Sequence, residues 1–125
     1  MVQKSVAPHD GNPVTSIGEG AFEKCFFLTS VTIPEGVTNI GSYAFRGCLG
    51  LTSLAIPTRI TDIAPGAFAS CYGLTELIIP SNVKSIGIGS FQYCRSLASL
   101  TIPSSVITIG DIAFRDCVSL ASLAI

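Results

Sequence analysis

Hydrophobic and polar positions alternate in a pattern that recurs along nearly the whole chain, always after the same step in residue number. In residues 51–73, Leu54 and Ile56 alternate with small neighbours, which predicts a short β-strand whose two large side chains face inward. Pro57 follows and has no amide N–H, so we expect it to end the strand and turn the chain. Each repeat is therefore predicted to contain one strand that stops at a corner.

The rest of the repeat predicts a second extended side and a tight turn. Ile60 and Ile63 are three apart in sequence and indicate the second short extended side. The segment that follows fits a single helical or 3₁₀ turn with Phe68 and Cys71 on one face. In the other repeats this segment begins with glycine, which we expect to supply a bend with positive φ. These glycines are Gly18, Gly41, Gly87 and Gly110.

Residues at equivalent positions of successive repeats form columns, and these columns indicate the fold class. Phenylalanine recurs at Phe22, Phe45, Phe68, Phe91 and Phe114, and cysteine recurs with the same spacing from Cys25 to Cys117. A unit this small cannot bury its own apolar face and must stack on its neighbours, so the sequence predicts a repeat solenoid. The predicted units are residues 11–33, 34–56, 57–79, 80–102 and 103–125. Residues 1–10 are interpreted as a non-repeat lead-in, and the stretch from Ala7 to Gly11 is expected to be unstructured.

The stretch from Leu28 to Cys48 carries a recognisable motif, Leu-x-x-Val-x-Ile-Pro-x-x-Val-x-x-Ile-Gly-x-x-Ala-Phe-x-x-Cys. This motif resembles the BspA-type leucine-rich repeat, and the resemblance covers residues 11–125. It implies a right-handed solenoid with a parallel sheet on the concave face and short turns opposite. It also suggests a protein-binding role, often at cell surfaces. Ala64, Ser90 and Ile60 depart from the pattern without placing the fold in doubt.

Composition narrows the classes of partner. Charged residues make up only 12% of the chain and the net charge is −1, with the basic residues scattered. This distribution argues against binding to nucleic acid or to an anionic membrane surface. The apolar runs are too short to cross a bilayer, so no membrane insertion is expected. The first ten residues lack the apolar stretch of a signal peptide, and the compartment stays open apart from the cell-surface or secreted location suggested by the resemblance.

The sequence predicts no catalytic, cofactor or metal site. The cysteines share one inward column, and we interpret them as reduced thiols that pack as small hydrophobic groups. A metal site would need Cys-x-x-Cys pairs or a histidine partner, but the single histidine, His9, lies outside the repeats. A nucleophilic triad lacks its histidine for the same reason. The glycine pairs near Glu19 and Ile88 do not continue into a dinucleotide-binding loop.

Two outward surfaces are the candidate partner-binding sites. The first is the outward face of the strands, which is nearly uncharged and is interrupted in the middle by Glu76 and Ile78. Its candidate residues are Ser53, Ala55, Glu76, Ile78, Ser99 and Thr101. The second is the column that follows each cysteine, with candidates Phe26, Leu49, Tyr72 and Arg95. The alternative for both surfaces is structural: small residues pack well at strand spacing, and the second column would lie half-buried against the strand rim.

These observations favour a non-catalytic protein-protein interaction module of a larger, surface-displayed repeat protein. The alternative is a structural or scaffold subunit embedded in a larger intracellular assembly. Solenoids need polar caps at their ends. None is visible in this sequence, because Ile125 is the last inward residue of a strand. We therefore also expect end-to-end self-association through uncapped terminal coils.

Overall fold

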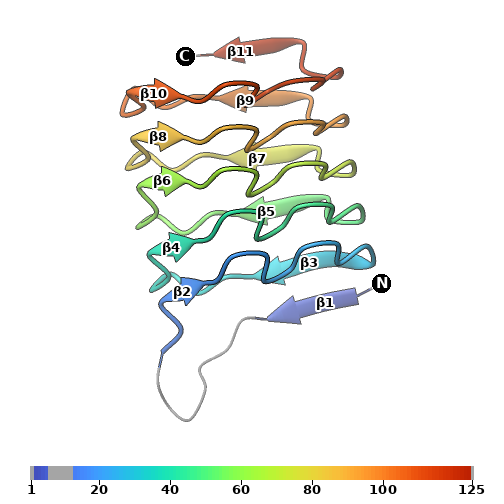
Figure 1. The fold of residues 1–125 in the computed structure, drawn as a ribbon, viewed down its shortest axis with the longest axis vertical. Helices are drawn as coiled ribbons and strands as arrows, with labels where there is room; N and C mark the ends of the chain where they lie inside the picture. The colour runs from blue at the N-terminus through green and yellow to red at the C-terminus, as the bar shows by residue number, and fades with distance from the viewer. Residues whose placement is uncertain (1, 6–12, 125) are drawn as a thin grey trace.

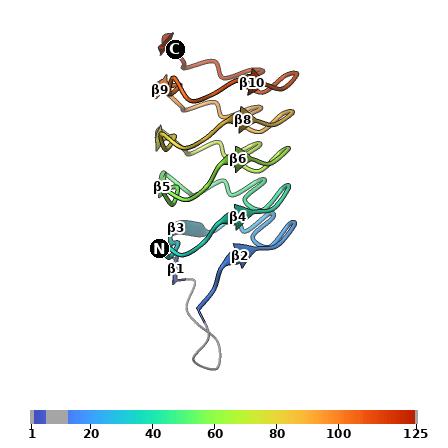
Figure 2. The same ribbon diagram turned by 90° about the vertical axis from the view of Figure 1, so that its left-hand side faces the viewer.

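The computed structural model describes residues 2–5 and 13–124, and in these residues it shows short strands and turns stacked into a column of coils (Figure 1). None of the described residues forms a helix, so none belongs to a helix long and apolar enough to span a bilayer. Each complete coil contributes one strand to the concave face and one to a second sheet, and the two sets lie on opposite sides of the column (Figure 2). The predicted repeat solenoid is confirmed.

The concave face carries the longer strands. They are β1 (Val2–Ser5), β3 (Leu28–Thr32), β5 (Ser53–Ala55), β7 (Glu76–Ile78), β9 (Ser99–Thr101) and β11 (Ser122–Ala124). The order β5-β7-β9-β11 forms one parallel sheet, and β1 pairs with β3 in a separate two-stranded sheet. Within the four-stranded sheet each residue lies beside its equivalent in the next repeat, as Leu54 does beside Leu77. The predicted inward side chains, Leu54 and Ile56, are buried.

The second sheet consists of two-residue strands. They are β2 (Ser16–Ile17), β4 (Asn39–Ile40), β6 (Asp62–Ile63), β8 (Ser85–Ile86) and β10 (Thr108–Ile109). β2 pairs with β4, and β6, β8 and β10 form a separate three-stranded sheet. Ile60 and Ile63 are 1% and 3% exposed, which confirms the second extended side predicted from their spacing.

Stacked phenylalanine rings form the centre of the core. Phe45, Phe68 and Phe91 are fully buried. From Phe22 to Phe114, successive rings lie 5.2–5.6 Å apart between centroids and within 8° of parallel. A repeat of constant length with no insertion places each ring above the previous one, and the offset-stacked geometry adds to the gain from burial. Ile109, in the last described coil, is 43% exposed, whereas its equivalent Ile86 is 1% exposed; self-association through terminal coils stays a prediction.

The turn around Phe68 is not the helical or 3₁₀ turn expected from the sequence. Ala67 and Ala69 donate hydrogen bonds to the carbonyls of Ala64 and Gly66, but the intervening amide of Phe68 donates to Ser90 in the next coil at 2.8 Å. Alternate amides therefore bind within and between coils, so no continuous helix can form. We call this ladder, with its equivalents in the other coils, the turn edge.

The glycine column at the start of each turn has a different role from the predicted one. Gly41, Gly87 and Gly110 do not adopt positive φ. A Cβ at Gly41 would lie 2.6 Å from the amide nitrogen of Glu19, and one at Gly110 would lie 2.5 Å from that of Ile88. Glycine is required here because the backbone of the preceding coil is too close for a side chain. Positive φ occurs two positions later instead, for example at Gly20 and Gly66.

Within the predicted non-repeat lead-in, Val2–Ser5 is a strand that the sequence did not reveal. This segment forms β1 and pairs in parallel with β3, with Lys4 opposite Val31 and Ser5 opposite Thr32. These partners are further apart in sequence than equivalent residues of two repeats, because the connection from β1 to the first repeat is longer. The other residues of the predicted lead-in lie outside the described residues. A short extended segment cannot show the repeat pattern, but it can still add to an open sheet edge.

Candidate partner-binding surface

The concave face brings all six residues of the first candidate surface together. Side chains alternate along β5, β7 and β9, so the middle residue of each strand enters the core and the outer two are exposed. In the sheet Ser53 lies beside Glu76, and Ala55 lies beside Ile78. Glu76 in turn lies beside Ser99. The structure therefore places these residues on one continuous surface, and their binding of a partner stays a prediction.

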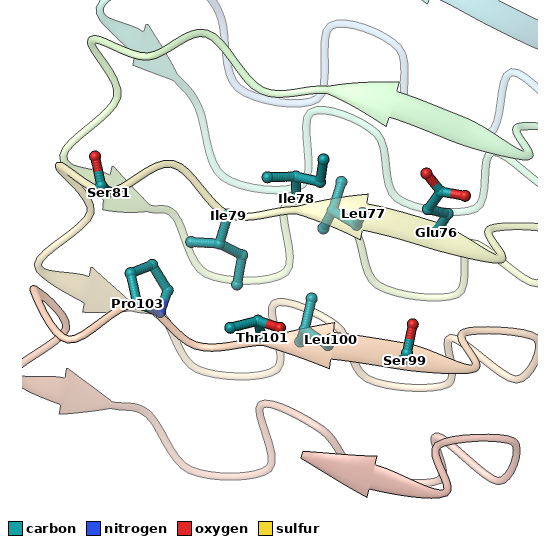
Figure 3. Close-up of a pocket in the computed structure, with 9 residues that line it drawn as sticks. All are labelled: Glu76, Leu77, Ile78, Ile79, Ser81, Ser99, Leu100, Thr101 and Pro103. Carbon is teal, nitrogen blue, oxygen red and sulfur yellow. The ribbon is translucent and has the colours of Figure 1, made fainter. Parts of the chain in front are cut away.

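Ile78 and Glu76 dominate this surface. The Ile78 side chain is 73% exposed, among neighbours that are small or hydroxylated. Shallow hollows of about 400 and 420 Å³ lie on its two sides, and both are lined by Glu76 and Ile78. Figure 3 shows the hollow toward β9, with Ser99 and Thr101 on the neighbouring strand. The hollows provide space for a partner's side chains on either side of one apolar projection.

The electrostatics of the hollow between β5 and β7 are acidic. Glu35 and Glu76 both line it. Glu35 accepts hydrogen bonds from the amide and the hydroxyl of Thr58, at 3.4 and 3.2 Å. In the part of the chain that the structure describes, no salt bridge involves Glu76. Its carboxylate is therefore available to a basic group of a partner.

The second candidate surface also forms a continuous column, but it is only partly exposed. Phe26, Leu49 and Tyr72 are 48%, 38% and 39% exposed. The guanidinium of Arg95 lies 4.9 Å from the centre of the Tyr72 ring, which is the geometry of a cation–π contact. Arg95 therefore covers part of the apolar column. The structure supports the half-buried arrangement considered above, and a binding role for this column stays a prediction.

A third hollow, of about 260 Å³, lies on the turn edge and was missed by the sequence analysis. Its lining includes Tyr43, Gly66, Gly89 and Ile112, which occupy one column. Two large side chains flank two glycines in this column, and the Tyr43 ring lies so close to Gly66 that a Cβ there would be 2.4 Å from it. Ile88, beside it, is 57% exposed. The pair of adjacent glycines in a column that also holds tyrosine and isoleucine is the sequence signal that could have revealed it.

The cysteine column is structural in the described residues. All five thiols are free, and that of Cys71 donates a hydrogen bond to the carbonyl of Phe45 in the preceding coil, at 3.2 Å. Cys48, Cys94 and Cys117 make equivalent bonds at 3.1 Å. Burial raises the pKa of Cys48 and Cys94 to about 12. The thiols are thus protonated donors, and among the described residues no group of His, Cys, Asp and Glu could hold a metal ion.

Comparison with known families identifies the repeat. The family model described as the BspA type leucine rich repeat region matches residues 8–125 in six copies. The chain therefore belongs to the BspA-type leucine-rich repeat family. Leucine-rich repeats are in general protein-interaction modules, and their folds are in general binding scaffolds instead of enzymes. No curated protein matches the chain in sequence.

Solved bacterial structures share the fold. A leucine-rich repeat protein from Bacteroides ovatus is 34% identical with a TM-score of 0.93, covering 99% of this chain and 33% of that one. A leucine rich repeat protein from T. pallidum is 37% identical with a TM-score of 0.90, covering 96% of this chain and 56% of that one. A leucine rich cell surface protein from Faecalibacterium prausnitzii is 26% identical with a TM-score of 0.57, covering 97% and 46%. The chain thus spans between a third and just over half of the length of these proteins.

Proposed function

We propose that this chain is a non-catalytic protein-protein interaction module of a larger, surface-displayed repeat protein. The observation that carries the proposal is the exposed Ile78 on the concave face, with a hollow on each side and the Glu76 carboxylate on the same strand. The family supports a binding role in general. The description of the Faecalibacterium prausnitzii protein as a cell surface protein supports the surface location.

The physical case for this face rests on what a partner would bury. Covering an isoleucine side chain contributes about 1.5–3 kcal/mol when burial is complete. The neighbouring Ser53, Ala55 and Ser99 are small, so a partner can approach the sheet closely around Ile78. A basic group placed beside Glu76 would satisfy its carboxylate and orient the partner. An extended segment with a basic and an apolar side chain two positions apart fits this spacing, because strand residues two apart face the same way.

The test uses two isoleucine substitutions that are matched in chemistry and exposure. Ile78 is 73% exposed on the concave face, and Ile107 is 78% exposed next to β10. The immobilised chain is incubated with surface proteins of neighbouring cells, and captured proteins are quantified by mass spectrometry. A true partner is retained by the wild type and by Ile107→Lys, is lost with Ile78→Lys, and binds the purified wild type in calorimetry. Equal capture by all three chains would refute the proposed face. A fourth chain, Leu49→Glu, tests the second surface, and loss of capture with this variant alone would move the interface there.

A further inference from the structure

The second sheet is interrupted between β4 and β6. In the other coils the ladder is closed: Gly41 donates to the carbonyl of Ile17 at 2.8 Å, and Gly87 donates to that of Ile63 at 2.8 Å. Within the described part of the chain, the equivalent amide of Ala64 makes no such bond to Ile40, and β4 and β6 belong to separate sheets. Figures 1 and 2 both show β6 standing further from β4 than from β8.

The cause is the one residue that breaks the glycine column. A Cβ at Gly87 would lie 2.7 Å from the carbonyl oxygen of Ile63, and at Gly41 and Gly110 the approach is equally short. Ala64 carries a Cβ at this position. Since real Cβ atoms do not approach a backbone so closely, the coil that contains Ala64 must stand away from the coil beneath it. The ladder bond then cannot form.

The segments that follow β4 and β6 remain joined on their other sides. On the turn edge, Phe45 donates to Ala67 at 2.8 Å and Gly47 donates to Ala69 at 2.9 Å. On the concave face, β5 pairs with β7 from Ser53 to Ala55. This pair of coils is therefore held along two sides and open along the third, which is the arrangement of a hinge.

We propose that the gap between β4 and β6 is a hinge, created by Ala64, that sets the width of the concave hollow between β5 and β7. The gap and the hollow belong to the same pair of coils, on opposite sides of the core. When the gap opens, β5 and β7 tilt toward each other about the ladder that joins them. The outward side chains Ala55 and Ile78, which line the hollow, then approach one another. Segments without ladder bonds open more readily than fully bonded ones, so this motion requires no unfolding of the coils on either side.

Amide hydrogen exchange followed by NMR on the intact chain tests the hinge. The amides of Thr61 and Ala64 face the gap, and their equivalents one coil later, Lys84 and Gly87, donate to Thr61 and Ile63. After correction for intrinsic rates, we expect Thr61 and Ala64 to exchange at least about tenfold faster than Lys84 and Gly87. Equal protection of the two pairs would overturn the proposal.

Two matched substitutions test the cause. Ala64→Gly should slow exchange at residues 61 and 64 to the range of Lys84 and Gly87, and should shift the amide resonances of Ala55 and Ile78 more than that of Thr101. Gly87→Ala should do the reverse one coil later, exposing the amides of residues 84 and 87. If Gly87→Ala fails to fold, Ala64→Gly decides alone. Unchanged exchange at Thr61 in Ala64→Gly would show that Ala64 is not the cause, and unmoved resonances at Ala55 and Ile78 would separate the gap from the hollow.

Discussion

Raising the pH above about 9 should destabilise the solenoid through its buried thiols. Cys48, Cys71 and Cys94 are fully buried. Burial raises the pKa of Cys48 and Cys94 from 9.0 to about 12 and that of Cys71 well above 9.0, and repulsion from neighbouring thiols in the column adds to this. The unfolded chain loses these protons near pH 9, whereas the fold keeps them. The stability that protonated thiols provide is therefore complete below pH 9 and falls between about 9 and about 12.

The size of the effect follows from the number of thiols. One thiol that ionises only in the unfolded state lowers the free energy of unfolding by about 1.4 kcal/mol between pH 8 and pH 10. Three such thiols lower it by about 4 kcal/mol, a large share of the roughly 5–15 kcal/mol that stabilises a typical domain.

Urea unfolding at pH 8 and pH 10, under reducing conditions, measures this loss. Cys71→Ala is the matched control, because it leaves two of the three thiols and should reduce the loss to about 3 kcal/mol. Two results would refute the reasoning. One is a wild-type stability that does not change between pH 8 and pH 10, and the other is a loss that is the same in Cys71→Ala.

Three further predictions concern the core. Phe68→Ala should lower the free energy of unfolding by about 3–5 kcal/mol, because the ring is fully buried between Phe45 and Phe91; an unchanged urea midpoint would contradict its placement. Ser90→Ala should raise the free energy of unfolding by about 1–3 kcal/mol, because the Ser90 hydroxyl is buried without a hydrogen-bond partner among the described residues. A lower thermal midpoint in Ser90→Ala would show that the hydroxyl does have a partner. Thiol titration of the unfolded chain should find all five cysteines, and a smaller number would indicate oxidation.

The columns could be predicted from the sequence because a repeat without insertions forces equivalent residues into equivalent environments. This argument placed Phe68, Cys71 and Leu54 in the core, and it placed Glu76 and Ile78 together on the outer surface. The argument predicts which side chains face inward and which face outward, because this alternation depends only on strand geometry and on the period of the repeat.

The reason for the glycine column could not be read from the sequence. A glycine can be required by positive φ or by close backbone approach, and only the distance to the preceding coil distinguishes them. Positive φ instead falls on columns of mixed residue types, such as the one holding Gly20, Tyr43 and Ile112. Composition gives no consistent signal there, because Gly66 and Gly89 share the column with Tyr43 and Ile112. Ala64 is visible in the sequence as a departure from the glycine column. Its effect on the hydrogen-bond ladder depends on the distance to the preceding coil, which the sequence does not show.

The thiol bonds of the core give the stack a chemical direction. Each thiol donates to a phenylalanine carbonyl of the coil before it, from Cys48 to Phe22 through Cys117 to Phe91. In these thiol bonds a coil donates to the coil before it and accepts from the coil after it, whereas turn-edge amides such as that of Phe68 donate to the coil after. Two such arrays can be spliced head to tail at any whole number of repeats with the series of thiol bonds continued, whereas a head-to-head junction would set thiol donor against thiol donor. Repeats of this kind can be lengthened, shortened or recombined by duplication, but never inverted.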